Sequence, residues 1–104
     1  RVTATTVRVP VKTGHSESVN VETTKKLSAA EAREILARAP GVIVMDDPAN
    51  DVFPTALDSA DKDDTLVGRI REDLSHPSAL DMWIVSDNLL KGAALNAVQI
   101  AELL

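Results

Sequence analysis

The sequence predicts a domain of the α+β class: a mixed β-sheet with helices packed on one face, and a helix that ends the chain. Strands are indicated where apolar and polar residues alternate, or where short apolar runs lie between turn signals. Helices are indicated where apolar residues recur three and four positions apart. A chain of 104 residues is long enough for one domain with its own core.

The composition restricts the classes of partner. A net charge of −5 disfavours nucleic acid, because proteins that bind phosphate backbones gather Lys and Arg into patches. No apolar run approaches the roughly 20 residues of a membrane-spanning helix, so we expect no membrane segment. The absence of Cys excludes a disulfide framework and fits a reducing, cytoplasmic compartment. The chain starts at Arg1 without an initiator Met, and we expect it to be part of a longer protein.

Two strands joined by a turn are predicted at the start of the chain. Valines alternate with Arg and Pro within residues 3–11, which is the period of a strand with one buried face. After turn residues at 12–14, the alternation returns in residues 16–22. We therefore expect a hairpin with His15 beside its bend.

A helix is predicted next, because Ser28-Ala29-Ala30-Glu31 forms a capping box. Pro40-Gly41 ends the helical pattern, and residues 42–45 are typical of a short buried strand. Residues 46–64 are rich in Asp and broken by two prolines, so we expect a solvated excursion with little regular structure. The predicted helix has one apolar stripe, formed by Ala32, Ile35, Leu36 and Ala39.

Two more strands are predicted at residues 65–71 and 80–85, followed by a helix over residues 89–104. Ser86 or Asp87 is available as the N-cap of this helix. One face of the helix is apolar and needs a partner to bury it. It consists of Leu90, Ala94, Ala97 and Ala101.

Two matches to known motifs are rejected. Asp61, Asp63 and Glu72 have the spacing of calcium-loop ligands, but Leu66 stands where the loop requires Gly, so no metal site is expected. Three strings imitate a penicillin-binding serine site, but their order along the chain is scrambled. They are Lys12-Thr13-Gly14, Ser59-Ala60-Asp61-Lys62 and Ser86-Asp87-Asn88.

Arg8 and His15 have the most coherent chemistry in the sequence. In a hairpin both side chains could face one cleft. The planar, charged guanidinium of Arg8 could bind a carboxylate, and His15 could accept and donate a proton near neutral pH. From the pattern alone, a surface Arg and a loop His are the alternative interpretation.

Three blocks of sequence resemble the aspartate-β-semialdehyde dehydrogenases of the bacterial type. The blocks follow one another in the same order as in that family. The blocks span nearly the whole chain, which makes the resemblance specific. They are Val7-Arg8-Val9-Pro10-Val11 leading to Gly14-His15-Ser16-Glu17-Ser18-Val19, then Val67-Gly68-Arg69-Ile70-Arg71, then Val85-Ser86-Asp87-Asn88-Leu89-Leu90-Lys91-Gly92-Ala93-Ala94-Leu95-Asn96 with Val98-Gln99-Ile100-Ala101-Glu102.

The resemblance implies an oxidoreductase that interconverts aspartate semialdehyde plus phosphate and aspartyl phosphate, with NADP as cofactor, in lysine, methionine and threonine synthesis. It implies that His15 is the acid/base residue, that Arg8 binds the substrate carboxylate, and that Asn88 contacts the nicotinamide. It also implies a cytoplasmic enzyme that forms a homodimer or homotetramer.

The resemblance further implies that residues 1–104 are the C-terminal part of a catalytic and dimerisation domain. Residues 87–104 would be the helix that returns to a nucleotide-binding domain. The family's Cys nucleophile is absent from this chain, so we expect the chain alone to be inactive. Two alternatives stay open: a non-catalytic dimerisation module derived from that family, and N-acetyl-γ-glutamyl-phosphate reductase, which shares the thioester chemistry.

Overall fold

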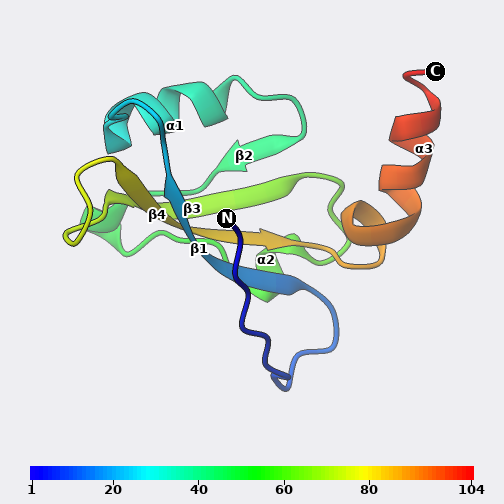
Figure 1. Cartoon of the computed structure of the whole chain (residues 1–104). Helices are drawn as coiled ribbons and strands as arrows, with labels where there is room; N and C mark the ends of the chain where they lie inside the picture. The colour runs from blue at the N-terminus through cyan, green and yellow to red at the C-terminus, as the bar shows by residue number, and fades with distance from the viewer.

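The structure is a computed structural model that describes residues 1–104. Figure 1 shows its strands and helices, which begin with a strand and end with a helix. Two short elements are not α-helices: η1 is a 3₁₀-helix, and η2 is a turn of π-helix. In chain order the elements are β1 (His15–Glu22), α1 (Ala29–Ala37), β2 (Val42–Val44), η1 (Pro48–Asn50), α2 (Ala56–Ser59), β3 (Thr65–Glu72), β4 (Ala79–Ser86), η2 (Leu90–Ala94) and α3 (Leu95–Ala101).

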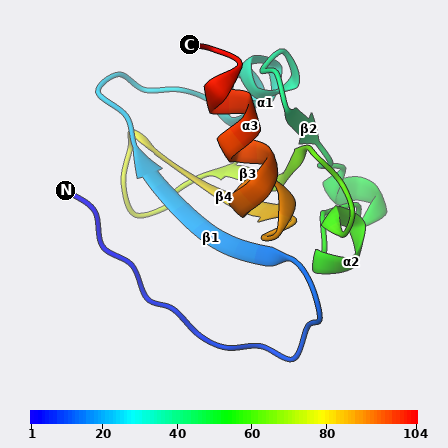
Figure 2. The same ribbon diagram turned by 90° about the vertical axis from the view of Figure 1, so that its right-hand side faces the viewer.

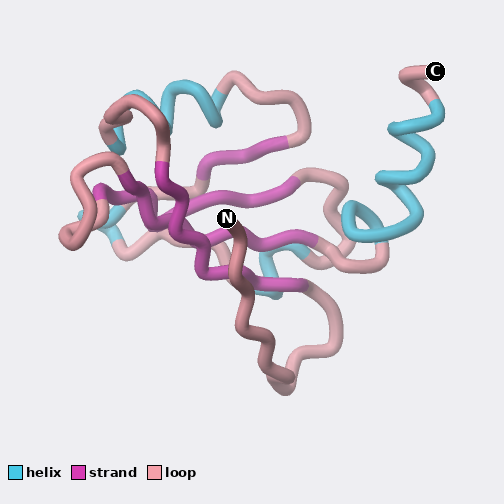
Figure 3. The backbone as a smooth tube through the Cα atoms, in the orientation of Figure 1, coloured by secondary structure: helices cyan, strands magenta, loops and turns pink.

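The four strands form one mixed sheet in the order β1-β4-β3-β2. β4 is antiparallel to both β1 and β3, whereas β2 runs parallel to β3. Figure 3 shows the strands side by side, with the helices and loops around them. The predicted α+β class, the mixed sheet and the terminal helix are therefore confirmed, as are the two strands expected at 65–71 and 80–85.

The strand predicted at residues 3–11 is wrong, and with it the hairpin. Residues 1–14 contain no strand, and Val7 is 84% exposed. A strand needs a neighbour that completes its backbone hydrogen bonds, and the only partner of β1 in the sheet is β4. Figure 2 shows the N-terminal segment running apart from the sheet. The alternating valines of residues 3–11 therefore have no neighbouring strand to pair with.

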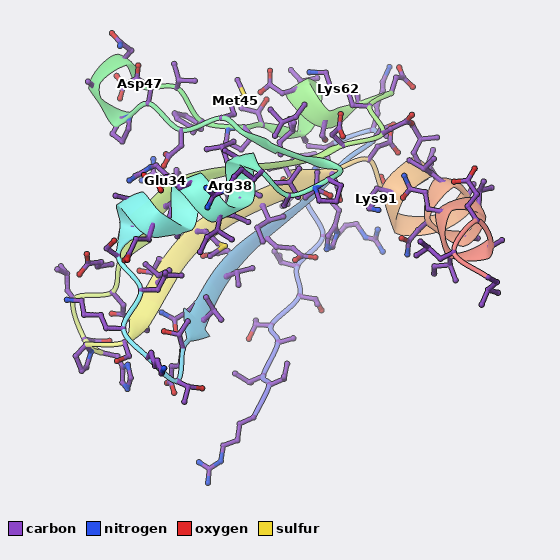
Figure 4. All side chains as sticks on the ribbon, turned by 90° about the horizontal axis from the view of Figure 1, so that it is seen from above. Glu34, Arg38, Met45, Asp47, Lys62 and Lys91 are labelled. Atoms are coloured by element: carbon purple, nitrogen blue, oxygen red, sulfur yellow. The ribbon has the colours of Figure 1, made fainter.

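Helix α1 begins at the predicted capping box. The Ser28 hydroxyl accepts a hydrogen bond from the Glu31 N–H at 3.3 Å, and a Glu31 carboxylate oxygen accepts one from the Ser28 N–H at 2.9 Å. The apolar stripe is narrower than expected, because Ala32 is buried but Ile35 is half exposed. In Figure 4, Glu34 lies on α1 and Arg38 lies directly after the helix end. Both are exposed, so the helix contacts the sheet along a narrow face.

The hydrophobic core is small and lies between α1 and one face of the sheet. Only 11 of the 104 residues are buried, so a large part of the sheet is open to solvent or to a partner. The expected burial of residues 42–45 is wrong for Ile43, because β2 is an edge strand. The central core cluster consists of Ala32, Val67, Ile70 and Leu80.

Residues 46–64 are less solvated than expected. They contain η1 and α2, and Pro54 and Ser59 are fully buried. The Pro54 carbonyl accepts a hydrogen bond from the Trp83 indole N–H at 3.2 Å. Trp83 neighbours Ile84, which packs on the α1 side, and successive strand residues point to opposite faces. The segment therefore covers part of the face opposite α1.

Gly68 allows the segment of residues 46–64 to pass close to the centre of β3. A Cβ atom at Gly68 would overlap the carbonyl oxygen of Met45 and would stand 2.5 Å from Cδ of Pro54. Both neighbours are held rigidly, because Met45 is hydrogen-bonded to Val67 across the strands and Pro54 is buried. A side chain at position 68 would push the two layers apart.

We expect Gly68→Ala to destabilise the protein by about 1–3 kcal/mol or more, the usual effect of overpacking a close contact. Gly92→Ala is the matched control, because the nearest atoms to a Cβ there are 3.8 Å away and Ala favours helix over Gly. Urea denaturation of the full-length protein that contains this chain measures the stability of both variants. Equal midpoints for the two variants would contradict the close-contact argument.

The C-terminal helix forms as predicted, but it begins with the π-helical turn η2 before the regular α3. Figure 1 shows α3 standing off the end of the sheet, and in Figure 4 Lys91 lies near the start of this helix. Of the predicted apolar face, Ala94, Ala97 and Ala101 are exposed, whereas Leu90 is half-buried. No helix is long and apolar enough to cross a membrane.

Candidate functional site

One end of the sheet collects two of the three predicted site residues. β1 begins where β4 ends, so His15 is the register partner of Ser86. The chain then continues from Ser86 to Asp87 and Asn88, directly before η2. This arrangement brings Asn88 next to the turn that precedes His15, although the two are far apart in sequence.

The His15 imidazole is accessible at this end. Its Nε2 lies 2.9 Å from Oε1 of Glu17, two residues further along the same face of β1. The imidazole side chain is 60% exposed, so a ligand can reach it. A carboxylate that bonds one ring nitrogen orients the imidazole and leaves the other nitrogen for proton transfer.

Gly14 shapes the turn before His15. Its φ of +103° is a conformation that residues with a side chain rarely adopt. A Cβ there would also approach Ala56 of α2 to 3.0 Å. The Gly14 N–H donates a 2.9 Å hydrogen bond to Oδ1 of Asn88. Gly14 is therefore fixed between α2 and the start of the C-terminal helix.

Asp87 caps the C-terminal helix, as one of the two predicted candidates. Its carboxylate accepts hydrogen bonds from the N–H groups of Leu89 at 2.7 Å and Leu90 at 3.2 Å. It also accepts one from the Asp61 N–H at 2.9 Å, which ties in the loop after α2. The bond from Asp61, followed by those from the helix start, lowers the pKa of the Asp87 carboxyl, so it stays ionised.

The structure does not bring Arg8 to His15. Arg8 lies in the exposed N-terminal segment, where its guanidinium has no ion pair or hydrogen bond. The expected hairpin that would have placed both side chains over one cleft is absent, so this geometric reason for pairing them is lost. The role of Arg8 in binding a carboxylate stays a prediction.

A second polar cluster, centred on Asp46, was missed by sequence reasoning, which treated the Asp-rich segment as solvated. The Asp46 side chain is only 1% exposed. It accepts hydrogen bonds from Nε of Arg33 at 2.7 Å and from the backbone N–H groups of Arg69 at 2.7 Å and Ile70 at 3.2 Å. Asp46 stands two residues after β2, and its partners Arg33, Arg69 and Ile70 are distant in sequence, so no local pattern indicated its burial.

The Asp46 cluster stabilises an irregularity in β3. The register with β4 shifts between Gly68 and Arg71, and Arg69 has a φ of +53° there. Arg33 completes the cluster with a 2.5 Å bond to the Ile70 carbonyl. The bulge places the Arg69 guanidinium 5.6 Å from the centre of the Phe53 ring, in cation–π contact.

Arg69 and Phe53 line two shallow hollows on the surface. One, of about 440 Å³, also includes Ser16 and Trp83. The other, of about 310 Å³, includes Arg33. Neither hollow is lined by His15 or Arg8. No group of three or more His, Cys, Asp or Glu side chains is arranged to hold a metal ion.

Comparison with protein families gives one match. Residues 1–91 match the family described as semialdehyde dehydrogenase, dimerisation domain. The aspartate-semialdehyde dehydrogenase of Aquifex aeolicus (strain VF5) is 55% identical over 104 residues, which are 100% of this chain and 31% of that protein. That of Legionella pneumophila is 57% identical over 104 residues, covering 99% of this chain and 30% of that protein.

Solved structures give the same result. The crystal structure of aspartate semialdehyde dehydrogenase II from Vibrio cholerae, complexed with ASA, matches with a TM-score of 0.86 and 46% identity. The match covers 92% of this chain and 28% of that one. The chain therefore spans about 30% of the length of the curated relatives it matches.

Proposed function

The chain belongs to the semialdehyde dehydrogenase family, whose dimerisation domain it matches, and on that premise we propose that it is the C-terminal part of an aspartate-semialdehyde dehydrogenase. The observation that supports this most directly is 55% identity to such an enzyme across all 104 residues. The resemblance found in the three sequence blocks is confirmed by these relatives.

The reaction that we propose for the full-length protein is the reversible oxidation of L-aspartate 4-semialdehyde by NADP in the presence of phosphate, which gives L-4-aspartyl phosphate and NADPH. It serves lysine, methionine and threonine synthesis in the cytoplasm. A thiol nucleophile is needed for this chemistry, and this chain has no Cys. This chain supplies the acid/base residue and the group that binds the substrate carboxylate.

His15 is the acid/base residue in this proposal. It takes the hydroxyl proton of the enzyme-bound semialdehyde adduct as that carbon is oxidised, and it returns a proton in the reverse direction. The exposed imidazole and its 2.9 Å contact with the Glu17 carboxylate support the role, because a base must be accessible and a nearby carboxylate favours its protonated form. Arg8 binds the α-carboxylate of the substrate through two parallel N–H donors.

NADP, when bound, supplies the hydride acceptor. Asn88 is the residue of this chain that would hold the nicotinamide carboxamide. Its side chain fits the task in one respect: Oδ1 is engaged by Gly14, which leaves the Nδ2 amide protons free to donate to a carbonyl oxygen.

The proposed assembly is a homodimer or homotetramer. The family's description as a dimerisation domain supports this, and so does the small core, which leaves much apolar surface without a partner within the chain. Residues 87–104 would be the helix that packs on the nucleotide-binding domain. The uncovered Ala94, Ala97 and Ala101 support that placement.

The test is an assay of the full-length protein with aspartate semialdehyde, phosphate and NADP, in which the absorbance of NADPH reports the reaction rate. Turnover that requires all three supports the proposal. Turnover with N-acetyl-glutamate semialdehyde instead would favour the reductase alternative, although the relatives described above all carry the aspartate-semialdehyde name. No turnover with either substrate would favour a non-catalytic dimerisation module.

Arg8→Ala is expected to raise the KM for aspartate semialdehyde about 10- to 100-fold, because a charge-assisted bond to a carboxylate contributes roughly 1.5–3 kcal/mol. Steady-state kinetics with varied semialdehyde measure this. The control is Arg38→Ala, since Arg38 is an exposed arginine at the C-cap of α1 whose guanidinium has no partner. An unchanged KM in the Arg8 variant would remove Arg8 from the substrate site.

A further inference from the structure

The link between Gly14 and Asn88 suggests a role for Asn88 that cofactor binding does not include. We propose that Asn88 is a positioning residue for His15: it holds the turn before β1 through the Gly14 N–H, and it is itself held by Asp87. This inference rests on the proposed function, because it assigns His15 the acid/base role.

The start of β1 has few other restraints on the side of the N-terminus. Residues 1–13 join no strand or helix, so they do not fix the position of His15 from upstream. Gly14 is the first residue whose N–H is bonded to a distant part of the chain, and its acceptor is Asn88 at 2.9 Å. The other restraint on His15 is its pairing with Ser86.

Asn88 is well placed to act as a fixed support. Ser86 belongs to the β1–β4 ladder, and the Leu89 N–H is bonded to the Asp87 carboxylate. Asp87 is only 2% exposed, and its three backbone donors include Asp61, two residues after α2. The backbone on both sides of Asn88 is therefore restrained.

The contacts form a closed circuit of three segments. α2 lies beside Gly14, since a Cβ at position 14 would stand 3.0 Å from Ala56, and the loop after α2 bonds to Asp87 through Asp61. Asp87 adjoins Asn88, which bonds back to Gly14. The low pKa of Asp87 keeps its carboxylate ionised, so this circuit persists across the neutral range. A shift of any one segment would displace the peptide that leads into His15.

Substitutions can separate the functions of the oxygen and the nitrogen of the Asn88 side-chain amide. A backbone N–H can donate only to the side-chain oxygen, so Oδ1 serves the Gly14 link and Nδ2 is left for a ligand. Asn88→Asp keeps an acceptor for Gly14 but removes the donor. Asn88→Ala removes both functions.

The experiment compares kcat, its pH profile and the KM for NADP of the full-length enzyme and these two variants. We expect Asn88→Ala to lower kcat about 10- to 100-fold and to change its pH profile, because a displacement of about 1 Å in an acid/base group has effects of this size. Asn88→Asp should recover most of the lost kcat while its KM for NADP stays raised. Asn96→Ala is the control, an exposed Asn on α3 without a hydrogen bond.

A loss confined to the KM for NADP in Asn88→Ala, with kcat and its pH profile unchanged, would overturn the inference and leave Asn88 as a cofactor contact only. Hydrogen exchange of the peptide containing Gly14 gives a second readout that needs no activity. Exchange at Gly14 should be faster in Asn88→Ala than in Asn96→Ala, and equal rates would overturn the link. An inactive wild-type enzyme would instead overturn the proposed function, while the exchange result would still decide whether Asn88 holds Gly14.

Discussion

Replacing His15 with Ala in the full-length enzyme is expected to lower kcat about 10²- to 10⁴-fold, the usual contribution of a positioned acid/base group. The reason is local, because the imidazole is exposed at the end of the sheet and its close polar contact is the Glu17 carboxylate. The fold should survive, since no buried contact is lost. The measurement is the steady-state rate of NADPH formation at saturating semialdehyde, phosphate and NADP.

The matched control for His15→Ala is His76→Ala. His76 is the other histidine of the chain, and its Nδ1 accepts a hydrogen bond from the Ser78 N–H in the exposed loop between β3 and β4. That loop is at the opposite end of β4 from Ser86, the partner of His15. Near-normal kcat in the His15 variant would make His15 a structural residue of the turn and would refute the central assignment.

Asp46→Ala is expected to destabilise the protein by about 2–4 kcal/mol, somewhat less than the roughly 3–5 kcal/mol for a fully buried pair, because Arg33 is about one-third exposed. The substitution leaves Arg33 without its carboxylate and leaves the N–H groups of Arg69 and Ile70 without acceptors. The bulge in β3 should loosen as a result. Urea denaturation of the full-length protein measures the change.

The control for Asp46→Ala is Asp63→Ala, because Asp63 is exposed in the same Asp-rich segment. A surface substitution of this kind is expected to change stability by no more than about 0.5 kcal/mol. Asp46→Asn should be intermediate, since an amide oxygen still accepts one of the backbone donors. Equal stability of the Asp46 and Asp63 variants would show that the cluster does not hold the bulge.

Local patterns predicted those elements whose cause is local. The capping box at Ser28 and the strand patterns at residues 65–71 and 80–85 are properties of neighbouring residues, and the structure confirms all three elements. The failure at residues 3–11 has a physical reason. Alternation indicates which side chains share a face, but it does not supply a neighbouring strand.

The site was predictable only in part for a similar reason. The capping role of Asp87 follows from its place before a helical pattern, and the structure confirms it. His15 and Asn88 were identified by resemblance, and their roles stay predictions. The Asn88–Gly14 bond and the burial of Asp46 both depend on segments distant in sequence, so no local pattern contains them.

The pairing of β1 with β4 has a consequence for synthesis on the ribosome. Within this sheet, β1 is the first strand to be translated, and its partner β4 (Ala79–Ser86) is the last. Contacts so distant in sequence form late and slow folding, and an unpaired strand is open to association with other chains in the meantime. Nascent chains stalled before Ala79 should therefore remain sensitive to protease at His15–Glu22, whereas chains that have released Ser86 should be protected there.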